Sequence, residues 1–129
     1  MKEIKYNELV NMLEAGKKHP VLINVLPRTD FLKNHIPGSI NIPVEEIPQE
    51  AKKLFAKHDW IVVYCANTGC EVSHKAANKL AQLGFENVFR FTGGVDEWKK
   101  SNSYTCCEQG EATQKGTSTK TGQPYSQNG

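Results

Sequence analysis

A cysteine stands where an apolar stretch of the chain gives way to a polar loop. Cys65 follows Trp60–Tyr64, the most apolar strand-like run, and precedes small or polar residues and a helical pattern from residue 72. Backbone N–H groups in such a turn can converge on one point, and the positive end of the following helix faces the same place. Both effects favour the thiolate, which is the nucleophilic form. We therefore predict a catalytic Cys65 whose sulfur is ionised and reachable.

The residues after Cys65 form the predicted anion-binding loop. Their backbone N–H groups would be the cradle for the sulfur or for an anion on it: Ala66, Asn67, Thr68, Gly69, Cys70 and Glu71. His74 and Lys75 follow and could add positive charge if either faces the pocket. Exposed helix positions are the simpler interpretation of both.

Cys70 is a second thiol in the same loop, five positions after Cys65. It is a candidate resolving thiol, which would attack a persulfide or sulfenic acid on Cys65, release sulfide or water, and leave a disulfide. A loop residue without a redox role explains its presence equally well.

The cysteine pattern as a whole argues against a structural metal. Four cysteines are too few and too unevenly placed for a disulfide scaffold. Their C-x4-C and C-C spacings match zinc sites poorly, so we expect neither a metal nor another cofactor. Cys106 and Cys107 are best explained as an incidental pair near the end of the domain.

The elements that position these residues alternate between strands and helices. Apolar, β-branched runs predict strands at residue 4 and over residues 21–26, 39–42, 60–64 and 87–91. Helical spacing of apolar residues predicts helices over residues 5–17, 28–34, 48–57, 72–83 and 95–100. This alternation is typical of an α/β three-layer sandwich, with a mostly parallel central sheet flanked by helices. Sites in open parallel sheets lie beyond the carboxyl ends of the strands, where Cys65 falls.

Length and charge exclude several classes of protein. The chain has 129 residues, enough for one domain, and its 16 Lys+Arg against 14 Asp+Glu give a net charge of +2. This balance is too even to favour nucleic-acid binding, and no apolar stretch approaches the roughly 20 residues of a membrane span. The polar first residues contain no apolar signal core. We expect a cytoplasmic monomer without nucleic-acid or membrane partners.

The end of the chain differs in composition from the rest. No Leu, Ile, Val, Met, Phe or Trp occurs from residue 102 to residue 129. Such a segment buries too little apolar surface to offset the entropy of ordering it. We predict one domain over residues 1–104 and a disordered polar tail over residues 105–129.

Three segments resemble signatures of the rhodanese (sulfurtransferase) family. Residues 62–77 resemble its active-site loop, and HIPGSINIP at residues 35–43 resembles its G-H-I-P-G-A-x-N-I-P signature. GFENV at residues 84–88 and GGVDEW at residues 93–98 resemble its G-F-x-x-V…G-G-x-x-x-W signature. The order and spacing agree with the family, and the resemblance covers about residues 4–104.

The resemblance implies a single rhodanese-like domain with sulfurtransferase activity. Cys65 would accept a sulfane sulfur from thiosulfate or a persulfide and pass it to a thiophilic acceptor, cyanide or a thiol. A persulfide anion gains charge-assisted hydrogen bonds in a cradle of N–H groups, and the covalent intermediate implies ping-pong kinetics. The expected partners are thus a small sulfur donor and a thiol acceptor, with a protein persulfide as a further candidate donor.

The chain departs from the family pattern at two places. Asn24-Val25-Leu26 replaces the usual D-V-R, and the C-R-x-G-x-R loop is absent, since no arginine lies between Cys65 and Arg90. Thiosulfate would lose its bidentate partner, which favours a persulfide donor. Thr68 and Glu71 also fit a capping box that would start the helix early. We predict the wider loop instead, because the family starts its helix about six residues after the cysteine.

Other functions remain as alternatives. A thiol redox enzyme of the arsenate-reductase type could use Cys65 and Cys70, and a non-catalytic rhodanese-fold module could bind a partner through the same mouth. A dual-specificity phosphatase needs an arginine at the end of the loop to hold the phosphate. This chain has Cys70 or Glu71 there, which argues against a phosphatase.

Three further features of the motifs are best explained by structure rather than by chemistry. We expect a hydrogen-bonding role in the turn for His35, core packing for Trp98, and a tight turn at Gly93-Gly94 beside the active-site mouth.

Overall fold

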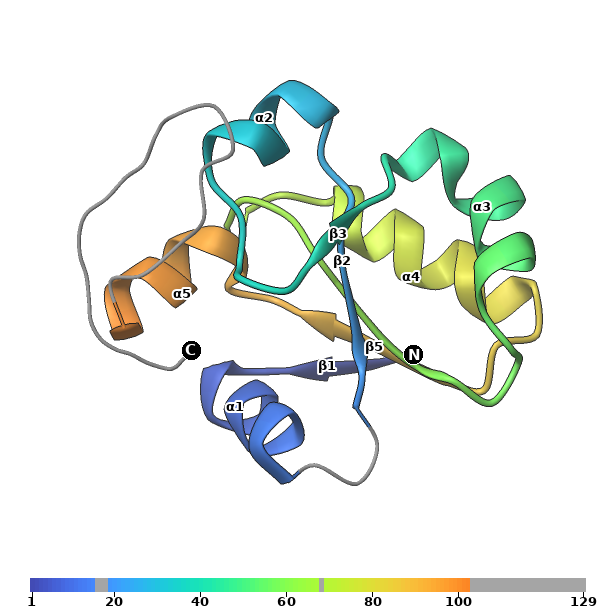
Figure 1. Ribbon diagram of the computed structural model, residues 1–129, viewed down its shortest axis with the longest axis horizontal. Coiled ribbons are helices and arrows are strands. Elements are labelled where there is room, and N and C mark those ends of the chain that lie inside the picture. The colour runs from blue at the N-terminus through green and yellow to red at the C-terminus, as the bar shows by residue number, and fades with distance from the viewer. Residues whose placement is uncertain (16–18, 68, 103–129) are drawn as a thin grey trace.

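The computed structural model describes residues 1–15, 19–67 and 69–102. Its centre is a five-stranded sheet in which all neighbouring strands are parallel, in the order β1-β5-β4-β2-β3 (Figure 1). The strands are β1 (Lys2–Ile4), β2 (Val21–Asn24), β3 (Ile40–Asn41), β4 (Trp60–Tyr64) and β5 (Asn87–Phe91). The helices are α1 (Tyr6–Ala15), α2 (Arg28–Lys33), α3 (Ile47–Leu54), α4 (Val72–Gln82) and α5 (Gly94–Asn102), with a 3-10 turn, η1 (Val44–Glu46).

Helices cover both faces of the sheet because the central strand is apolar on both sides. In β4, Ile61 and Val63 belong to a core cluster that includes residues of α3 and α4, while Val62 and Tyr64 belong to one that includes residues of α1 and α5. All four side chains are fully buried. Successive side chains of a strand point to opposite faces, so β4 fills two cores at once. The predicted three-layer α/β sandwich is confirmed.

The predicted elements agree with the observed ones best in the centre of the sheet. The bounds of β4 and β5 are those expected from sequence. β2 ends at Asn24 rather than at residue 26, because the side-chain oxygen of Asn24 accepts a hydrogen bond from the Leu26 N–H at 3.0 Å and turns the chain. β3 is shorter than predicted, because the N–H of Ser39 bonds within a turn to Ile36 O.

Each predicted helix differs from the observed one by one to three residues at an end, and α3 and α1 are the ones that end more than one residue early. The helix predicted over residues 48–57 is α3, which ends at Leu54 because Ala56 N–H then bonds to the carboxylate of Asp59. The helix predicted over residues 5–17 is α1, which ends at Ala15, and residues 16–18 lie outside the described residues. The predicted tail, residues 105–129, lies outside them as well.

The turn that contains His35 packs over the carboxyl end of β4. The hydroxyl of Tyr64 accepts a hydrogen bond from Ile36 N–H at 3.0 Å and bonds to Ser39 Oγ at 2.7 Å. His35 is buried, its ring stacks on Phe31, and its Nδ1 donates to the Phe31 carbonyl at 2.8 Å. The structural role predicted for His35 is therefore confirmed.

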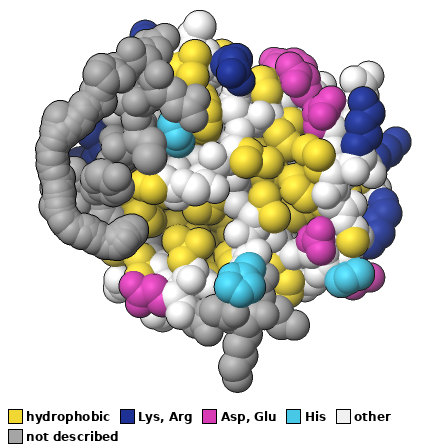
Figure 2. Space-filling view, viewed as in Figure 1, with side chains coloured by type: hydrophobic (Ala, Val, Ile, Leu, Met, Phe, Trp, Pro, Cys, Tyr) yellow, Lys and Arg dark blue, Asp and Glu magenta, His cyan; other side chains and the backbone are white. Residues whose placement is uncertain are grey.

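The surface carries few large apolar side chains. Among the described residues, Met1, Ile40 and Leu54 are the exposed ones, and they come from different parts of the fold. Figure 2 shows hydrophobic side chains near the centre of one face and Lys or Arg side chains along its right edge. None of the helices in the described ranges combines the length and hydropathy that membrane crossing requires. The predicted monomer stays a prediction.

Candidate active site

Cys65 lies directly after β4, at the carboxyl end of a strand between two neighbours. The loop continues to Glu71, and α4 begins at Val72. Six residues therefore separate the cysteine from the helix, which confirms the wider loop and not an early start at a capping box. Glu71 makes no side-chain capping hydrogen bond at the start of α4, and Thr68 lies outside the described residues.

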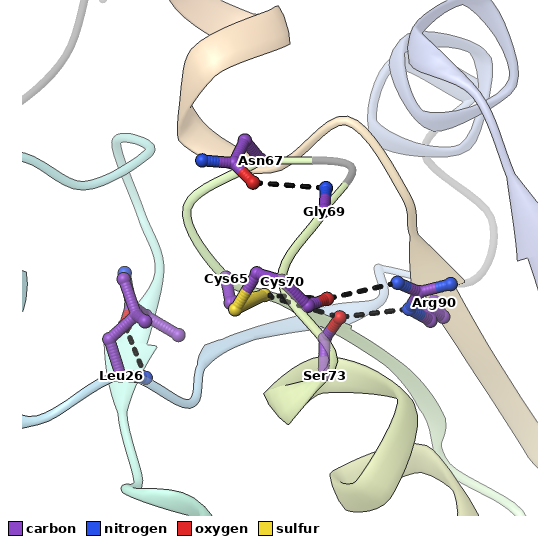
Figure 3. Close-up of a disulfide and its surroundings, with 8 residues drawn as sticks. Leu26, Cys65, Asn67, Gly69, Cys70, Ser73 and Arg90 are labelled. Carbon is purple, nitrogen blue, oxygen red and sulfur yellow. Dashed lines mark hydrogen bonds between the residues drawn. A yellow bond between two sulfur atoms is a disulfide. The ribbon is translucent and has the colours of Figure 1, made fainter.

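Cys65 and Cys70 are joined by a disulfide, with their Cα atoms 6.5 Å apart (Figure 3). Cys65 is only 2% exposed, whereas Cys70 is half-buried. The expectation that the Cys65 sulfur is reachable is wrong for this disulfide-bonded form, because its Sγ is bonded to Cys70 and lies 3.4 Å from the hydroxyl of Ser73. A free thiolate at Cys65 requires that the disulfide be reduced first.

Two N–H groups of the predicted cradle form hydrogen bonds within the loop itself. The side-chain oxygen of Asn67 accepts a hydrogen bond from Gly69 N–H at 3.0 Å, and its carbonyl accepts one from Cys70 N–H at 3.1 Å. In this form, these two N–H groups are therefore not free for an anion. Within the described ranges, the N–H groups of Ala66, Asn67 and Glu71 make no protein hydrogen bond.

The start of α5 holds the other side of the loop. Val95 N–H donates to the carbonyl of Cys65 at 3.0 Å, and Asp96 N–H donates to that of Ala66 at 2.9 Å. This close approach depends on Gly94, whose φ is +62° and whose added Cβ would lie 2.3 Å from the Cys65 carbonyl oxygen. The predicted tight turn at the glycine pair is confirmed, and it touches the loop through its backbone.

Arg90 of β5 provides the positive charge that reaches the loop. It is 8% exposed, and its guanidinium makes three contacts on three sides. Nε donates to Ser73 Oγ at 2.9 Å and Nη2 to the Cys70 carbonyl at 3.2 Å, while Nη1 forms an ion pair with Glu3 at 2.8 Å. Figure 3 shows the side chain pointing from β5 toward Cys70 and Ser73.

Ser73 connects this charge to the nucleophile. It is buried in the first turn of α4, and its oxygen accepts a hydrogen bond from Arg90. A hydroxyl has one donor hydrogen besides its acceptor positions, so the hydrogen of Ser73 can point at the Cys65 sulfur, 3.4 Å away. In the reduced protein, this arrangement can donate a hydrogen bond to a thiolate from a group that Arg90 already polarises.

Neither Ser73 nor Arg90 is among the site residues predicted from the sequence. A signal for Arg90 exists, since it is the charged residue of the strand NVFRF and lies two residues after Val88, on the face that packs against α4. Its partners follow from strand register, which pairs Arg90 with Glu3 of β1 and with Val63 of β4. That register is not visible in the sequence.

The predicted pocket cations lie elsewhere. His74 and Lys75 are exposed, because the buried face of α4 consists of Ser73, Ala76, Ala77 and Leu80. No described residue forms a hydrogen bond or ion pair with either side chain. The cation beside the loop is therefore Arg90 and not either of these residues.

The other residues singled out in the sequence lie away from the loop or outside the described residues. Trp98 is buried in the cluster under α1 and α5 and packs edge-on against Tyr6, with ring centroids 5.6 Å apart, which confirms core packing. Cys106 and Cys107 lie outside the described residues. No group of three or more metal-ligating side chains gathers anywhere in the described ranges.

The chain is similar to known proteins over nearly all of its described length. The family model for the Rhodanese-like domain matches residues 5–101. The HTH-type transcriptional regulator Rv0324 of Mycobacterium tuberculosis is 35% identical over 92 residues, which cover 71% of this chain and 39% of that protein. The chain thus spans less than half the length of this relative.

Two other relatives are closer to this chain in extent. The thiosulfate sulfurtransferase GlpE of Shewanella oneidensis is 26% identical over 102 residues, which cover 79% of this chain and 96% of GlpE. The crystal structure of the BH2092 protein from Bacillus halodurans superposes with a TM-score of 0.74 at 29% identity, covering 83% of this chain and 77% of that one. The family match, the parallel sheet and the cysteine at the end of β4 agree, and the chain belongs to the rhodanese-like domain family.

Proposed function

We propose that the protein is a sulfurtransferase in which Cys65 carries sulfane sulfur as a persulfide. The observation that carries this proposal is the position of Cys65, at the end of β4 and beside the Ser73–Arg90 pair. A thiolate at this point would receive a hydrogen bond from Ser73 and the field of a buried guanidinium. Relatives named as thiosulfate sulfurtransferases support the same chemistry.

The reaction consists of two displacements. The Cys65 thiolate attacks the sulfane sulfur of the donor, a sulfur–sulfur bond forms at Cys65, and the rest of the donor leaves with the electron pair of the broken bond. An acceptor thiolate or cyanide then attacks the outer sulfur, and Cys65 leaves as a thiolate. No net oxidation occurs, and donor and acceptor react in separate steps.

The contacts of Arg90 favour a persulfide over thiosulfate as donor. All three nitrogens of its guanidinium already bond to protein groups, namely Ser73, Cys70 and Glu3. Thiosulfate carries a sulfonate-like group that is best held by a free bidentate fork. A low-molecular-weight or protein persulfide needs less recognition of an anion, so it fits this site better.

The test uses fully reduced Cys70→Ser protein, in which Cys65 is the one cysteine left in the loop, and a panel of donors: thiosulfate, glutathione persulfide and mercaptopyruvate. We expect glutathione persulfide to add the mass of one sulfur atom to a peptide that contains Cys65, and to support transfer of sulfur to cyanide. Cys65→Ser should abolish both results. A gain of sulfur that persists in Cys65→Ser would overturn the proposal.

A second candidate function rests on the Cys65–Cys70 disulfide. In a thiol redox enzyme of the arsenate-reductase type, this bond would form at the end of each cycle. Arsenate-dependent consumption of a dithiol reductant, with no transfer of sulfur from any donor, would favour that function. A domain that shows neither activity would be a binding module.

A further inference from the structure

We propose that Cys70 resolves the Cys65 persulfide, so that the reduced domain releases sulfide and ends in the disulfide-bonded form. This inference rests on the proposed function, because a persulfide must first form on Cys65. It adds a distinct reaction, in which the protein itself reduces the sulfane sulfur instead of handing it to an external acceptor.

The loop holds Cys70 in bonding position from both of its peptide groups. Its N–H donates to the Asn67 carbonyl at 3.1 Å, and its own carbonyl accepts from Arg90 Nη2 at 3.2 Å. A further bond from Gly69 N–H to the side chain of Asn67 tightens the same turn. In the disulfide-bonded form these bonds hold Cys70 with its Cα 6.5 Å from that of Cys65, a separation that a disulfide can span.

The bond between the two Sγ atoms is the product expected if Cys70 attacks the inner sulfur of a persulfide. In a persulfide on Cys65, the inner sulfur is Sγ and the outer sulfur is the transferred atom. Attack by Cys70 on the outer sulfur would only move the persulfide from one cysteine to the other. Attack on the inner sulfur gives the observed bond.

The resolving step balances without any other reactant. The Cys70 thiolate attacks Sγ of the Cys65 persulfide, the Cys65–Cys70 bond forms, and the outer sulfur leaves as hydrosulfide with the electron pair of the broken bond. The sulfane sulfur is reduced to sulfide while two thiols are oxidised to a disulfide. Hydrosulfide is less basic than an alkyl thiolate such as that of Cys65, so it is the better leaving group. A dithiol reductant then restores both thiols for the next cycle.

The surroundings of Cys70 suit this role. Its carbonyl accepts a hydrogen bond from the buried guanidinium of Arg90, which fixes the backbone at Cys70 in this form. Cys70 is also half-buried whereas Cys65 is buried, so Cys70 is the more exposed of the two cysteines.

The experiment is a single turnover in the absence of external reductant. Fully reduced protein is freed of reductant and mixed with an equimolar amount of glutathione persulfide. Released glutathione reports formation of the persulfide, released sulfide reports its resolution, and intact mass identifies the final state. For wild type we expect a near-stoichiometric burst of sulfide and a protein with an internal disulfide and no added sulfur.

Two sets of variants isolate the resolving thiol. Cys70→Ser, and Cys70→Ala as a second version, should release glutathione at the wild-type level, keep the added sulfur, and lose at least nine tenths of the sulfide burst. The matched control is the double variant Cys106→Ser/Cys107→Ser, which leaves the loop intact and should behave as wild type. Cys65→Ser gives the background of both readouts.

The outcomes separate the two proposals. If wild type releases no glutathione and gains no sulfur, the sulfurtransferase proposal fails, and the resolving role fails with it. If wild type gains a persulfide that persists as long as in Cys70→Ser, the resolving role alone fails. A sulfide burst that disappears in Cys106→Ser/Cys107→Ser and survives in Cys70→Ser would assign resolution to Cys106 or Cys107. That result would also overturn the resolving role of Cys70.

Discussion

At the scale of single residues, the charge that serves the loop comes from outside it. The loop itself contains no arginine, and the exposed His74 and Lys75 do not replace one. Arg90 reaches the loop from the neighbouring strand β5, and Ser73 connects its Nε to the Cys65 sulfur. The site therefore depends on a relay of two buried side chains rather than on a free anion-binding fork.

Ser73→Ala tests the hydrogen bond to the nucleophile. The substitution removes a donor that can face a thiolate, and hydrogen bonds to charged groups contribute about 1.5–3 kcal/mol. In a reduced Cys70→Ser background, we expect alkylation of Cys65 at neutral pH to slow by about tenfold or more, and its pH profile to move to higher pH. The rate of iodoacetamide labelling against pH measures this shift.

The matched control for Ser73→Ala is Ser39→Ala. Ser39 is also buried and hydrogen-bonded, but its partners are Ile36 and Tyr64. Ser39→Ala should lower the free energy of unfolding without moving the pH profile of Cys65 alkylation. Equal shifts in the two variants would contradict the role of Ser73.

Arg90→Gln and Glu3→Gln should act in opposite directions on Cys65. Arg90→Gln removes the charge beside the loop, so it should slow alkylation of Cys65 and lower the free energy of unfolding by about 2–3 kcal/mol. Glu3 is half exposed, with 54% of its side chain accessible, so Glu3→Gln should change stability by less than about 1 kcal/mol.

Glu3→Gln also leaves the charge of Arg90 unbalanced beside the loop. Alkylation of Cys65 should therefore be as fast as in the parent or faster. Denaturant unfolding and labelling rates measure both effects in a Cys70→Ser background. Faster alkylation of Cys65 in Arg90→Gln than in the parent would contradict the proposed effect of the Arg90 charge.

At the scale of elements, the loop is clamped between two helices that come from opposite faces of the sheet. α4 continues from the loop and places Ser73 under Cys65, while the N–H groups that begin α5 bind the carbonyls of Cys65 and Ala66. Gly94 makes the second contact sterically feasible. The position of the nucleophile is thus fixed through backbone groups as well as through the disulfide.

Gly94→Ala should damage this clamp more than a glycine substitution in a similar backbone conformation elsewhere. The new Cβ would lie 2.3 Å from the Cys65 carbonyl oxygen, at a φ of +62°. At Gly38, φ is +86° but no atom lies within 4 Å of an added Cβ. We expect Gly38→Ala to cost about 1 kcal/mol and Gly94→Ala about 3 kcal/mol or more, with a loss of sulfur transfer only in the latter. Thermal unfolding and persulfide formation measure the difference, and equal costs would contradict it.

The elements also show how much of the fold and of the candidate site could be predicted from the sequence. β4 and β5 are short runs rich in β-branched and aromatic residues, and α4 shows Ala76, Ala77 and Leu80 at helical spacing. Cys65 could be identified because strand, loop and helix are contiguous in the chain. Arg90 could not, since its contacts with Ser73 and Glu3 depend on strand register and on how α4 packs over β5.

Errors at the ends of elements have local causes. The side chain of Asn24 ends β2, and the bond between Ala56 and Asp59 follows the end of α3; both involve polar side chains that bond to nearby backbone groups. Such bonds compete with regular structure over one or two residues, below the length at which hydrophobic periodicity is informative. The orientation of His74 and Lys75 depends on which face of α4 is buried.

At the scale of the whole molecule, the proposed cycle requires a fold that persists when the disulfide is absent. The cycle begins from two free thiols, so the reduced domain must stay folded. Two apolar clusters, one on each face of the sheet, contain most of the buried side chains. The disulfide itself closes only a short loop of five positions.

Reduction should therefore loosen the loop and leave the sheet intact. A disulfide that closes so short a loop contributes about 2 kcal/mol in the chain-entropy treatment, a minority of the about 5–15 kcal/mol of a typical domain. We expect reduction, or Cys70→Ser, to lower the free energy of unfolding by no more than this amount. Amide exchange should quicken over the described loop residues 66, 67 and 69–71, while β4 and β5 keep their protection. Loss of protection throughout the sheet on reduction would mean that the disulfide maintains the fold, and a cycle through the dithiol form would then be excluded.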